Sequence, residues 1–419
     1  MQKIELLNTP KEWGYFGVTL GAILCVSIFL SYLDFRDLTA YKYKTLENVT
    51  VLNQYTKINK KNKPYTVLKL RHKSYSFYTT AKADIPLLLN QQITLTIISD
   101  KLTFSDFFIP PFYLSSFNIK AEPSLYHQSV TFFQSQHKEP FLSEIFSSLF
   151  LASHIGYENR QILSSLGISH LVAISGYHLG LLSFLLYFVL SPIYQFFQNR
   201  FFPYRNRLYD LSLVVFVIVC VYAYAIGSPI SLVRSLFMMA FGIFLLLRHI
   251  YLLSFHSLGI IVCFILAINP HFVTSISFWL SVGGVFYIYL FLHYFKDINK
   301  IFLFLTLNIW LFLTMNIVSH FIFEQTSWWQ ILSPIFSIVF NVFYPLELFL
   351  HTFSWGGLLD SWLITGWEIV RQSPIWKVSV SLPFLIAYIL LSLGATWHKY
   401  IFVLFSVVVL MGNIYIYGT

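Results

Sequence analysis

The hydrophobic positions of this chain form long runs that are interrupted by one extended polar stretch. The first run, from Gly14 to Leu33, matches the roughly 20 apolar residues that a membrane-spanning helix needs. Later runs lie near residues 170–190, 210–227, 232–247, 250–268, 277–295, 301–319, 331–351, 379–396 and 400–417. The pattern therefore predicts a polytopic α-helical membrane protein with about ten transmembrane helices.

A cleaved signal peptide is another interpretation of the first run. The run is longer than a usual signal-peptide core, however, and it lacks an A-x-A cleavage site. We therefore expect residues 1–33 to be a retained N-terminal membrane anchor.

The polar stretch over residues 34–123 has the character of a β domain. Short runs rich in Val, Ile, Thr and Tyr alternate with groups of turn residues such as Asn59 to Pro64. The runs cover Asn48–Leu52, Tyr65–Arg71, Ser74–Thr80 and Ile93–Ile98. Four or five short strands in about ninety residues suit a small barrel better than a large sandwich.

Two other segments have patterns that suit more than one placement. Residues 124–166 predict a linker followed by an apolar helical stripe around Phe146, which fits an interfacial helix or a packed core helix. The segment Trp355–Val370 fits a span, a re-entrant segment or an interfacial helix. The remaining chain divides into a membrane domain over residues 167–352 and C-terminal interfacial and transmembrane helices over residues 353–419.

The composition excludes a soluble globular protein. The chain carries 27 Lys and Arg and 18 Asp and Glu side chains among 419 residues, or 11% charged, where soluble proteins carry about a quarter. The positive residues of the short loops between spans fall on one side, which should be cytoplasmic. They are Arg200, Arg205, Arg207, Arg248, Lys296 and Lys300. The β domain should then lie on the outer side of the membrane.

The surplus of positive charge is concentrated in the β domain and the linker. Residues 34–140 contain 14 basic and 8 acidic side chains, a net charge of +6, whereas residues 141–419 have a net charge of +3. Between Asn48 and Ala83 there are eight basic side chains and no acidic one, interleaved with Tyr and Phe. Cations that follow phosphates and aromatic rings that stack on bases together suit single-stranded nucleic acid. A solvated charged face and contact with anionic lipid headgroups are the alternatives.

We expect the following side chains of the β domain to contact a nucleic-acid strand: Lys57, Lys60, Lys61, Lys63, Lys69, Arg71, Lys73, Tyr75 and Phe77.

Polar residues within the apolar runs give a second signal. His170, Ser175 and His178 open the run near 170–190, and polar groups at membrane depth need partners or water. Gly176 lies four residues before another glycine, a spacing that lets a second backbone approach closely. Arg234 follows a break at Gly227-Ser-Pro, and an arginine at membrane depth should face a partner or a water-filled path. Histidines satisfied by neighbouring helices, and an arginine that extends to the headgroups, are the structural alternatives.

Further breaks occur at Asn269-Pro, before Ser281, and at Ser333-Pro334. Irregular backbone at membrane depth is tolerated where it is buried in protein or lines a cavity. Several such breaks in one chain indicate a pathway through the helices.

The segment His170-Leu-Val-Ala-Ile-Ser-Gly-Tyr-His178 closely resembles the signature of the ComEC competence proteins, the inner-membrane channels of natural transformation. Three later stretches are similar to that family's other motifs. They are Gly227 with Ser231-Leu-Val-Arg234, Asn269-Pro with Phe278-Trp-Leu-Ser281, and Ser333-Pro334 with Asn341 and Pro345. The resemblance covers roughly residues 14 to 352 and includes the order of anchor, outer OB-like β domain and competence-type channel domain.

The resemblance implies that one DNA strand passes through this protein into the cytoplasm while the other strand is degraded. The residues that it would place in or beside the channel are His170, Ser175, Gly176, His178, Ser231, Arg234 and Ser281. Many members of the family also have a metallo-β-lactamase-like domain, but this sequence contains no His-x-His-x-Asp-His run. We therefore expect a short form that is a channel and not an enzyme.

No cofactor or metal is expected. Cys25, Cys220 and Cys263 each lie in an apolar run and form no disulfide or zinc pattern. The sequence also contains no P-loop motif, so the pulling force should come from a cytoplasmic ATPase or from single-strand-binding proteins. The other expected partners are single-stranded DNA, the lipid bilayer and an extracytoplasmic DNA receptor, and a homo-oligomer stays open.

Two other classes of function compete with a channel. Ser175 could serve as a nucleophile with His178 or His170 as its base, which would make the chain an intramembrane serine hydrolase. No third orienting group is visible in the sequence, however. A transporter for small solutes or polyanions is the second alternative, and it lacks the inverted repeat that such transporters have.

Overall fold

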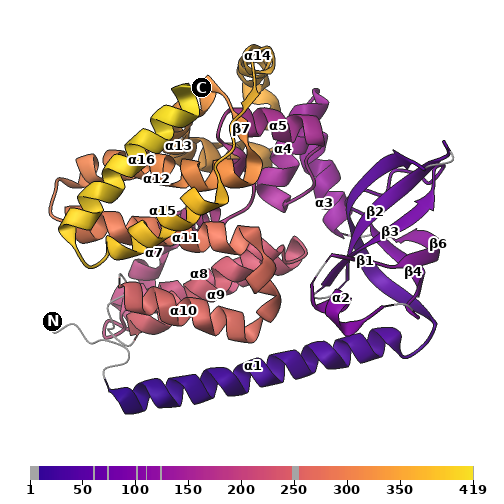
Figure 1. The fold of residues 1–419 in the computed structure, drawn as a ribbon, viewed down its shortest axis with the longest axis horizontal. Helices are drawn as coiled ribbons and strands as arrows, with labels where there is room; N and C mark the ends of the chain where they lie inside the picture. Colours follow the sequence, from indigo (N-terminus) through magenta and orange to yellow (C-terminus); the bar gives the residue numbers. More distant parts are fainter. Residues whose placement is uncertain are drawn as a thin grey trace.

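The structure is a computed structural model that describes residues 9–59, 62–72, 75–100, 102–109, 111–122, 125–247 and 254–418, without the side chains of residues 230 and 231. Figure 1 shows three parts: one long N-terminal helix, a β domain at one end of the molecule, and a helical bundle. The long helix α1 (Pro10–Thr39) runs beside the bundle and reaches the β domain. Leu38, near its end, is buried in the core of that domain.

Helix α1 begins at Pro10 because its first turn is capped. The Thr9 hydroxyl accepts a hydrogen bond from the Glu12 N–H at 3.3 Å, and the Glu12 carboxylate accepts one from the Thr9 N–H at 3.1 Å. The 30 residues of α1 extend about 45 Å, at 1.5 Å per residue. This length exceeds that of one span, so the C-terminal part is free to enter the β domain.

The β domain is a six-stranded sheet in the order β5-β3-β2-β1-β4-β6. Its elements are β1 (Tyr43–Ile58), β2 (Pro64–His72), β3 (Tyr75–Lys82), β4 (Gln92–Ile98), α2 (Phe104–Phe108), β5 (Phe112–Tyr113) and β6 (Ser115–Glu122). Strand β5 pairs in parallel with β3, and β6 pairs antiparallel with β4. Because only Leu114 separates β5 from β6, the two ends of the sheet meet.

Strand β1 is long enough to pair with two neighbours. Its register shifts between Leu46 and Val49, where Asn48 has a φ of 55°, and such a bulge bends a strand. The first part of β1 therefore pairs with β4 and the second part with β2. The fully buried core between these strands consists of Val49, Val51, Leu68, Leu70, Phe77, Ile93, Leu95 and Ile97.

The helical part begins with short helices and continues with long ones. The short ones are α3 (Leu125–Gln134), α4 (Pro140–Leu151), α5 (Tyr157–Ser165) and α6 (Ser169–Val172). The following helices are α7 (Gly176–Phe201), α8 (Arg207–Ala225), α9 (Ile230–Leu247), α10 (Phe255–Ile268), α11 (Ile276–Phe295), α12 (Lys300–Phe323), α13 (Ser333–Thr352), α14 (Asp360–Arg371), α15 (Leu382–Gly394) and α16 (Lys399–Gly418). Short 3₁₀ turns lie at Pro270–Thr274, Trp328–Leu332 and Gly356–Leu359, and β7 (Gln325–Thr326) pairs with β8 (Trp376–Lys377).

The helices confirm the membrane-protein class. In the part of the chain that the structure describes, seven helices are long and apolar enough to cross a membrane, and four shorter apolar helices accompany them. Seven of the ten predicted runs coincide with one of the long helices. The runs near 232–247, 250–268 and 379–396 coincide with the shorter helices α9, α10 and α15. The count of about ten spans therefore stays a prediction.

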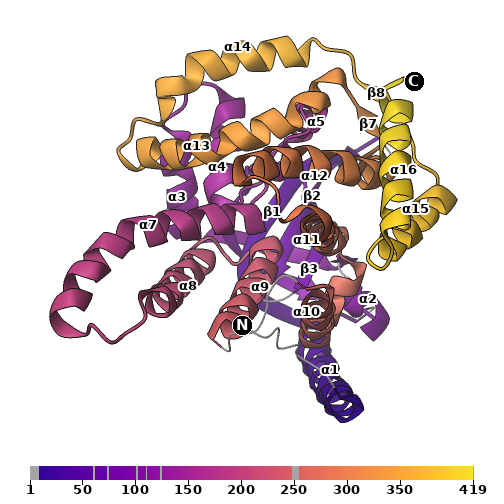
Figure 2. The same cartoon turned by 90° about the vertical axis from the view of Figure 1, so that its left-hand side faces the viewer.

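The two segments for which the sequence allowed more than one placement, residues 124–166 and Trp355–Val370, both contain helices. In α4, Leu142 and the whole of residues 146–151 are buried, so α4 is the packed core helix and not an interfacial one. Helix α14 has 12 residues, about 18 Å, which is too short to span a bilayer. Figure 1 shows α14 nearly end-on, whereas Figure 2 shows it lengthwise along the top of the molecule. It therefore runs across the direction of α1.

Candidate functional site

The most specific sequence motif lies where α6 ends and α7 begins. Residues 173–175 break the helix, and Ser175 is the N-cap of α7. The Ser175 hydroxyl accepts a hydrogen bond from the Tyr177 N–H at 3.3 Å, and Nδ1 of His178 accepts one from the Ser175 N–H at 3.3 Å. Ser175 and His178 thus satisfy the free backbone donors of the helix start. His170, on α6, belongs to a different helix from His178.

His170 and His178 also differ in exposure. His178 is only 3% exposed, and its ring lies 5.3 Å from that of Phe340 and 5.2 Å from that of Tyr344. His170 is exposed, as are Gly176 and Gly180 on the first turns of α7. A side chain added at Gly180 would meet nothing within 4 Å. The motif therefore has a packed face, which includes His178, and an accessible face, which includes His170.

Arg234 is a buried cation without a counter-ion. Only 4% of it is exposed, and its Nη1 donates one hydrogen bond, to the Ser277 hydroxyl at 3.3 Å. Its Nε has no acceptor, and none of the five ion pairs among the described residues includes it. Isolated charges are rarely buried because their desolvation is costly. Ser277, in contrast, is exposed.

The two other predicted serines are Ser231, which precedes Arg234 by three positions, and Ser281, which lies on helix α11. The side chain of Ser231 lies outside the described residues. Ser281 is half-buried on α11, one turn after Ser277 and on the same helix face.

Tertiary contacts bring the separate sequence motifs together. The Ser333 hydroxyl donates to the Gly167 carbonyl at 2.9 Å, and Tyr177 donates to the Asn341 side chain at 2.8 Å. Gly176 on α7 packs so closely on α9 that an added Cβ would lie 3.3 Å from the Ser235 hydroxyl. Together with the contact between α9 and α11, these contacts bring the four sequence motifs together. We call this region the polar centre and define it as Gly167, Gly176, Tyr177, Arg234, Ser235, Ser277, Ser333 and Asn341.

Arg71 connects the β domain to this centre. Its Nη1 donates to the Ser228 carbonyl at 3.5 Å, in the turn between α8 and α9. Gly227 in the same turn has a φ of +76°, which favours glycine, and an added Cβ would lie 3.0 Å from Nη2 of Arg71. A second contact joins His271, before α11, to the Phe108 carbonyl at 2.7 Å. The β domain is thus attached at the starts of α9 and α11, the two helices that hold Arg234 and Ser277.

The outward surface of strands β1, β2 and β3 alternates cations with tyrosines. We call it the basic face and define it as Tyr55, Lys57, Tyr65, Lys69, Arg71 and Tyr78. The Lys57 ammonium lies 5.6 Å from the Tyr55 ring, and the Lys69 ammonium lies 5.8 Å from the Tyr78 ring. The basic face reaches from Lys57, near the tip of the sheet, to Arg71 at the bundle.

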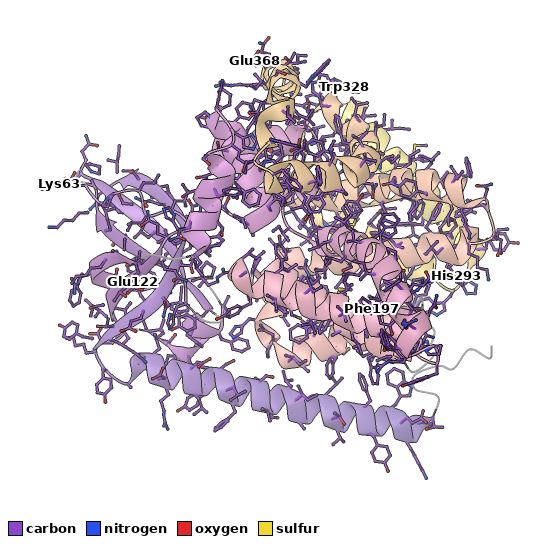
Figure 3. All side chains as sticks on the ribbon, turned by 180° about the vertical axis from the view of Figure 1, so that it is seen from behind. Lys63, Glu122, Phe197, His293, Trp328 and Glu368 are labelled. Carbon is purple, nitrogen blue, oxygen red and sulfur yellow. The ribbon has the colours of Figure 1, made fainter. Side chains whose placement is uncertain are left out.

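The structure corrects the expectation for two aromatic residues. Tyr75 is 6% exposed and Phe77 is fully buried, and both pack against Phe112 inside the β domain. Both rings are therefore unavailable for stacking on a base, whereas the tyrosines of the basic face are only partly buried. Lys63 is exposed at the tip of the sheet, remote from the helices (Figure 3). Lys60, Lys61 and Lys73 lie outside the described residues.

Positive charges also meet where the basic face approaches α5. Burial and then the nearby Arg160 lower the pKa of Lys69. Burial, with the charges of Arg160 and Lys69, lowers the pKa of His154 to about 4, so this histidine is uncharged at neutral pH. None of the five ion pairs in the described chain includes Lys69, Arg71 or Arg160. These cations are therefore not neutralised by carboxylates.

Sequence reasoning missed several residues of this arrangement. Ser277 belongs to the polar stretch up to Ser281 that marks a break in the sequence, but it is not one of the residues assigned to the channel, and Arg160 and His154 lie in a segment without a motif. The structure also contains, among the residues it describes, no group of three or more His, Cys, Asp or Glu that could hold a metal ion.

A family model described as "Competence protein" matches residues 152–416 of the chain. Recombination protein 2 of Haemophilus influenzae is 33% identical over 120 residues, which are 28% of this chain and 14% of that relative. The aligned stretch thus covers a small part of the relative's length. No solved structure matches the chain significantly. Because the family model covers well over half of the chain, this chain belongs to the ComEC family of competence proteins.

Proposed function

We propose that this chain is a channel that conducts single-stranded DNA across the bacterial inner membrane into the cytoplasm during natural transformation. The observation that carries the proposal is the buried Arg234, which has no counter-ion among the described residues and donates its hydrogen bond to the exposed Ser277. A buried cation is stabilised when an anion binds beside it and serves as its counter-ion. A phosphate group of a passing strand would be that anion.

The basic face is the surface on which the strand would first bind. From Tyr65 to Arg71, strand β2 extends about 20 Å, at roughly 3.3 Å per residue. Cations and tyrosine rings share this surface, with the buried Val67 between Tyr65 and Lys69, as in proteins that bind single strands by phosphate contacts and base stacking. The meeting of the two ends of the sheet, through β5 and β6, supports an OB-like barrel, a fold that often binds oligonucleotides.

Arg71 would bind the strand at the point where it passes from the basic face to the helical bundle. Its guanidinium contacts the α8–α9 turn, and Arg234 lies four residues, about one helical turn, after the start of α9 at Ile230. Lys69 and Arg160 lie beside this route and keep it positive. The path thus consists of cations without carboxylate partners, from the sheet to the polar centre.

Inside the bundle, the lining should bind phosphates weakly so that the polymer moves. Pores for anions use basic linings, and conduction needs sites that release as well as bind. One unpaired arginine with hydroxyl groups nearby meets both needs. The exposed His170 and Gly180, on the accessible face of the motif, would border the same path.

Within this proposal, the β domain faces the outer side and receives DNA from a receptor. A cytoplasmic ATPase or single-strand-binding proteins would pull the strand, since the sequence has no P-loop. The Ser175 Oγ lies 3.2 Å from Nδ1 of His178, as the hydrolase alternative would require. We favour a capping role for both residues, because they satisfy the backbone N–H groups at the start of α7 and the His178 ring is packed against aromatic rings.

The test replaces Arg234 by Gln in a transformable strain and measures transformation frequency at matched membrane levels of the protein. We expect a fall of about 10- to 100-fold, because one charge-assisted hydrogen bond contributes about 1.5–3 kcal/mol. Arg200→Gln, at an exposed arginine, is the matched control and should transform normally. Normal transformation by Arg234→Gln would contradict the proposal.

A further inference from the structure

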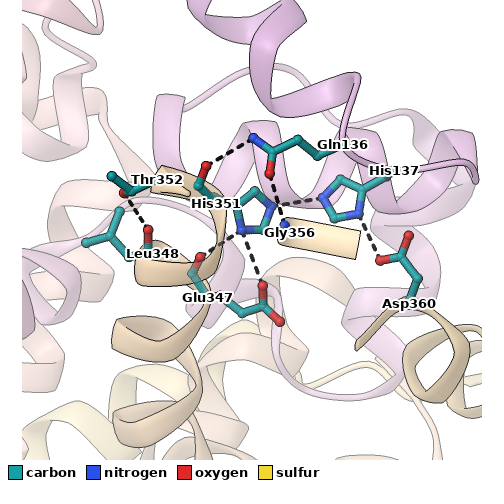
Figure 4. Close-up of polar contacts among 8 residues, drawn as sticks. All are labelled: Gln136, His137, Glu347, Leu348, His351, Thr352, Gly356 and Asp360. Atoms are coloured by element: carbon teal, nitrogen blue, oxygen red, sulfur yellow. Dashed lines mark hydrogen bonds and ion pairs between the residues drawn. The ribbon is translucent and has the colours of Figure 1, made fainter. Parts of the chain in front are cut away.

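Three buried titratable side chains and one partly exposed carboxylate, that of Asp360, form a continuous chain of contacts outside the polar centre (Figure 4). Asp360 Oδ1 lies 2.9 Å from Nδ1 of His137, and Nε2 of His137 lies 2.9 Å from Nε2 of His351. Nδ1 of His351 lies 2.7 Å from the Glu347 carbonyl oxygen and 3.3 Å from its carboxylate. His137 belongs to the loop between α3 and α4, whereas the others belong to α13 and α14.

The surroundings of this chain are dry. His351 and Glu347 are fully buried, and His137 is 8% exposed. The Phe146 ring stacks on His137 with centroids 4.5 Å apart, and the Phe150 ring lies 5.0 Å from that of His351. The titratable groups that face the two rings are Asp360 from α14 and Glu347 from α13, while α3 and α4 contribute phenyl rings.

The loop is fastened at this place by backbone contacts as well. The Gln136 side chain donates to the His351 carbonyl at 3.1 Å and accepts from the Gly356 N–H at 3.0 Å. A Cβ added at Gly356 would lie 2.6 Å from Nε2 of His351, and one added at Gly357 would lie 2.8 Å from the Gln136 carbonyl. Only glycine allows the turn before α14 to approach the two histidines this closely.

Counting hydrogens shows that the contacts need one proton more than two neutral histidines carry. The Glu347 carbonyl only accepts, so Nδ1 of His351 carries a hydrogen. The contact between the two Nε2 atoms needs a second hydrogen, and the contact of His137 with Asp360 needs a third. Two neutral imidazoles supply two. The third must be an added proton, which makes one ring cationic or keeps Asp360 neutral.

A metal ion does not explain the pair. Two nitrogens bound to one tetrahedral zinc at about 2.0–2.1 Å lie roughly 3.3 Å apart. The measured separation is 2.9 Å, which is normal for an N–H···N hydrogen bond. Among the described residues, no three His, Cys, Asp or Glu side chains are placed so that they could hold a metal ion, and this includes Asp360 and Glu347.

We propose that Asp360, His137, His351 and Glu347 are a proton-binding latch, which fastens the turn before α14 and the end of α13 to the loop that follows α3. The latch closes with three protons on Asp360 and the two rings. When it is open in alkaline solution, the same groups hold two, because a free histidine loses its proton near pH 6.5. When it is open in acid, they hold four. Closure therefore takes up a proton above about pH 6.5 and releases one below it.

The consequence is a latch that is tightest near pH 6.5 and loosens on either side. Above about pH 6.5, each further pH unit lowers the equilibrium constant for closing the latch by up to tenfold, because closing takes up one proton. Helix α3 follows the β domain directly in the chain, so the latch holds the connection between that domain and the bundle. Proton binding would thereby set how firmly this connection is held.

The substitution Asp360→Asn separates this account from a merely structural role. An Asn amide donates to Nδ1 of His137, whose Nε2–H then donates to His351, and every contact is made without an added proton. The experiment measures hydrogen exchange of residues 353–371 in the purified full-length protein at pH 6.5 and 8.5, corrected for the chemical exchange rate. His293→Gln, at an exposed histidine, is the control.

We expect protection in the wild type and in His293→Gln to fall about 10- to 100-fold between the two pH values. In Asp360→Asn it should change less than about threefold. Equal protection of the wild type at both pH values would overturn the proposal whether or not the variant folds. An equal fall in Asp360→Asn and wild type would overturn it as well.

Discussion

Replacing Arg234 by Met should stabilise the protein while it impairs DNA transport. Met has a similar length and no charge, so it fills the space without requiring a counter-ion. The substitution removes one hydrogen bond, the 3.3 Å contact with Ser277, which contributes about 1 kcal/mol. It also removes the desolvation cost of a buried, unpaired charge, which is several kcal/mol. The balance favours the variant by about 1–3 kcal/mol.

The assay for stability is thermal unfolding of the purified protein in detergent, followed by tryptophan fluorescence. A chain of 419 residues has an unfolding entropy of about 0.9 kcal/mol/K, so the expected rise in Tm is about 1–3 °C. The same variant should lower transformation frequency about 10- to 100-fold at normal membrane levels. Arg200→Met, at an exposed arginine, should change neither quantity.

Two results would refute the reasoning. A clear fall in Tm would mean that the charge of Arg234 already stabilises the fold through a partner within the protein, and is not left unpaired for a ligand. Unchanged transformation with a raised Tm would mean that the charge is buried without any use in transport.

Four further predictions follow from the same structure. Gly227→Ala should lower transformation and stability, by about 1 kcal/mol or more, because of its φ of +76° and the contact with Arg71, whereas Gly180→Ala, in open space, should not. In a filter-binding titration of the full-length protein with single-stranded DNA, Lys57→Gln with Lys69→Gln should reduce the salt dependence by about 0.7 per lost phosphate contact, and Lys377→Gln should leave it unchanged. The lowered pKa of His154, about 4, means that the unfolded chain binds a proton between pH 6.5 and 4 that the folded one does not. The free energy of unfolding should therefore fall as the pH is lowered from 6.5 to 4. In His154→Gln this fall should be smaller, as measured by Tm against pH. Gly356→Ala should lower Tm through overpacking worth about 1–3 kcal/mol, whereas Gly366→Ala, with open space around it, should raise Tm slightly.

The membrane class could be predicted because it depends on long apolar runs. Seven of these runs became helices of sufficient length. The polar residues Ser175 and His178 were visible in the sequence, but their role as the cap of α7 was not, because the run near 170–190 reads as one span. The break at residues 173–175 depends on the contacts of α7 with α9 and α13.

The aromatic face of the β domain was wrongly assigned for a related reason. In strand β3 both faces carry aromatic residues, with Tyr75 and Phe77 on one and Tyr78 on the other. A period of two separates the faces but does not say which one is buried. The curvature of the sheet decides this, since it encloses Phe77 with Phe112.

The histidine latch had no signal in the sequence at all. His137 and Asp360 are separated by 223 positions, and neither belongs to a motif: His137 lies in a polar loop and Asp360 at the start of α14. Arg234, in contrast, was visible because an arginine in an apolar run is rare. What the structure added is the absence of a counter-ion among its neighbours, and this absence carries the functional proposal.

The most direct test of the central claim follows fluorescent DNA into living cells. A strain that lacks the chromosomal gene would be complemented with the wild-type chain, with Arg234→Gln or with the control Arg200→Gln, each at equal membrane level. The account predicts that cytoplasmic fluorescence appears with the wild type and the control. With Arg234→Gln, DNA should remain outside the inner membrane. Equal cytoplasmic DNA in all three strains would contradict the account.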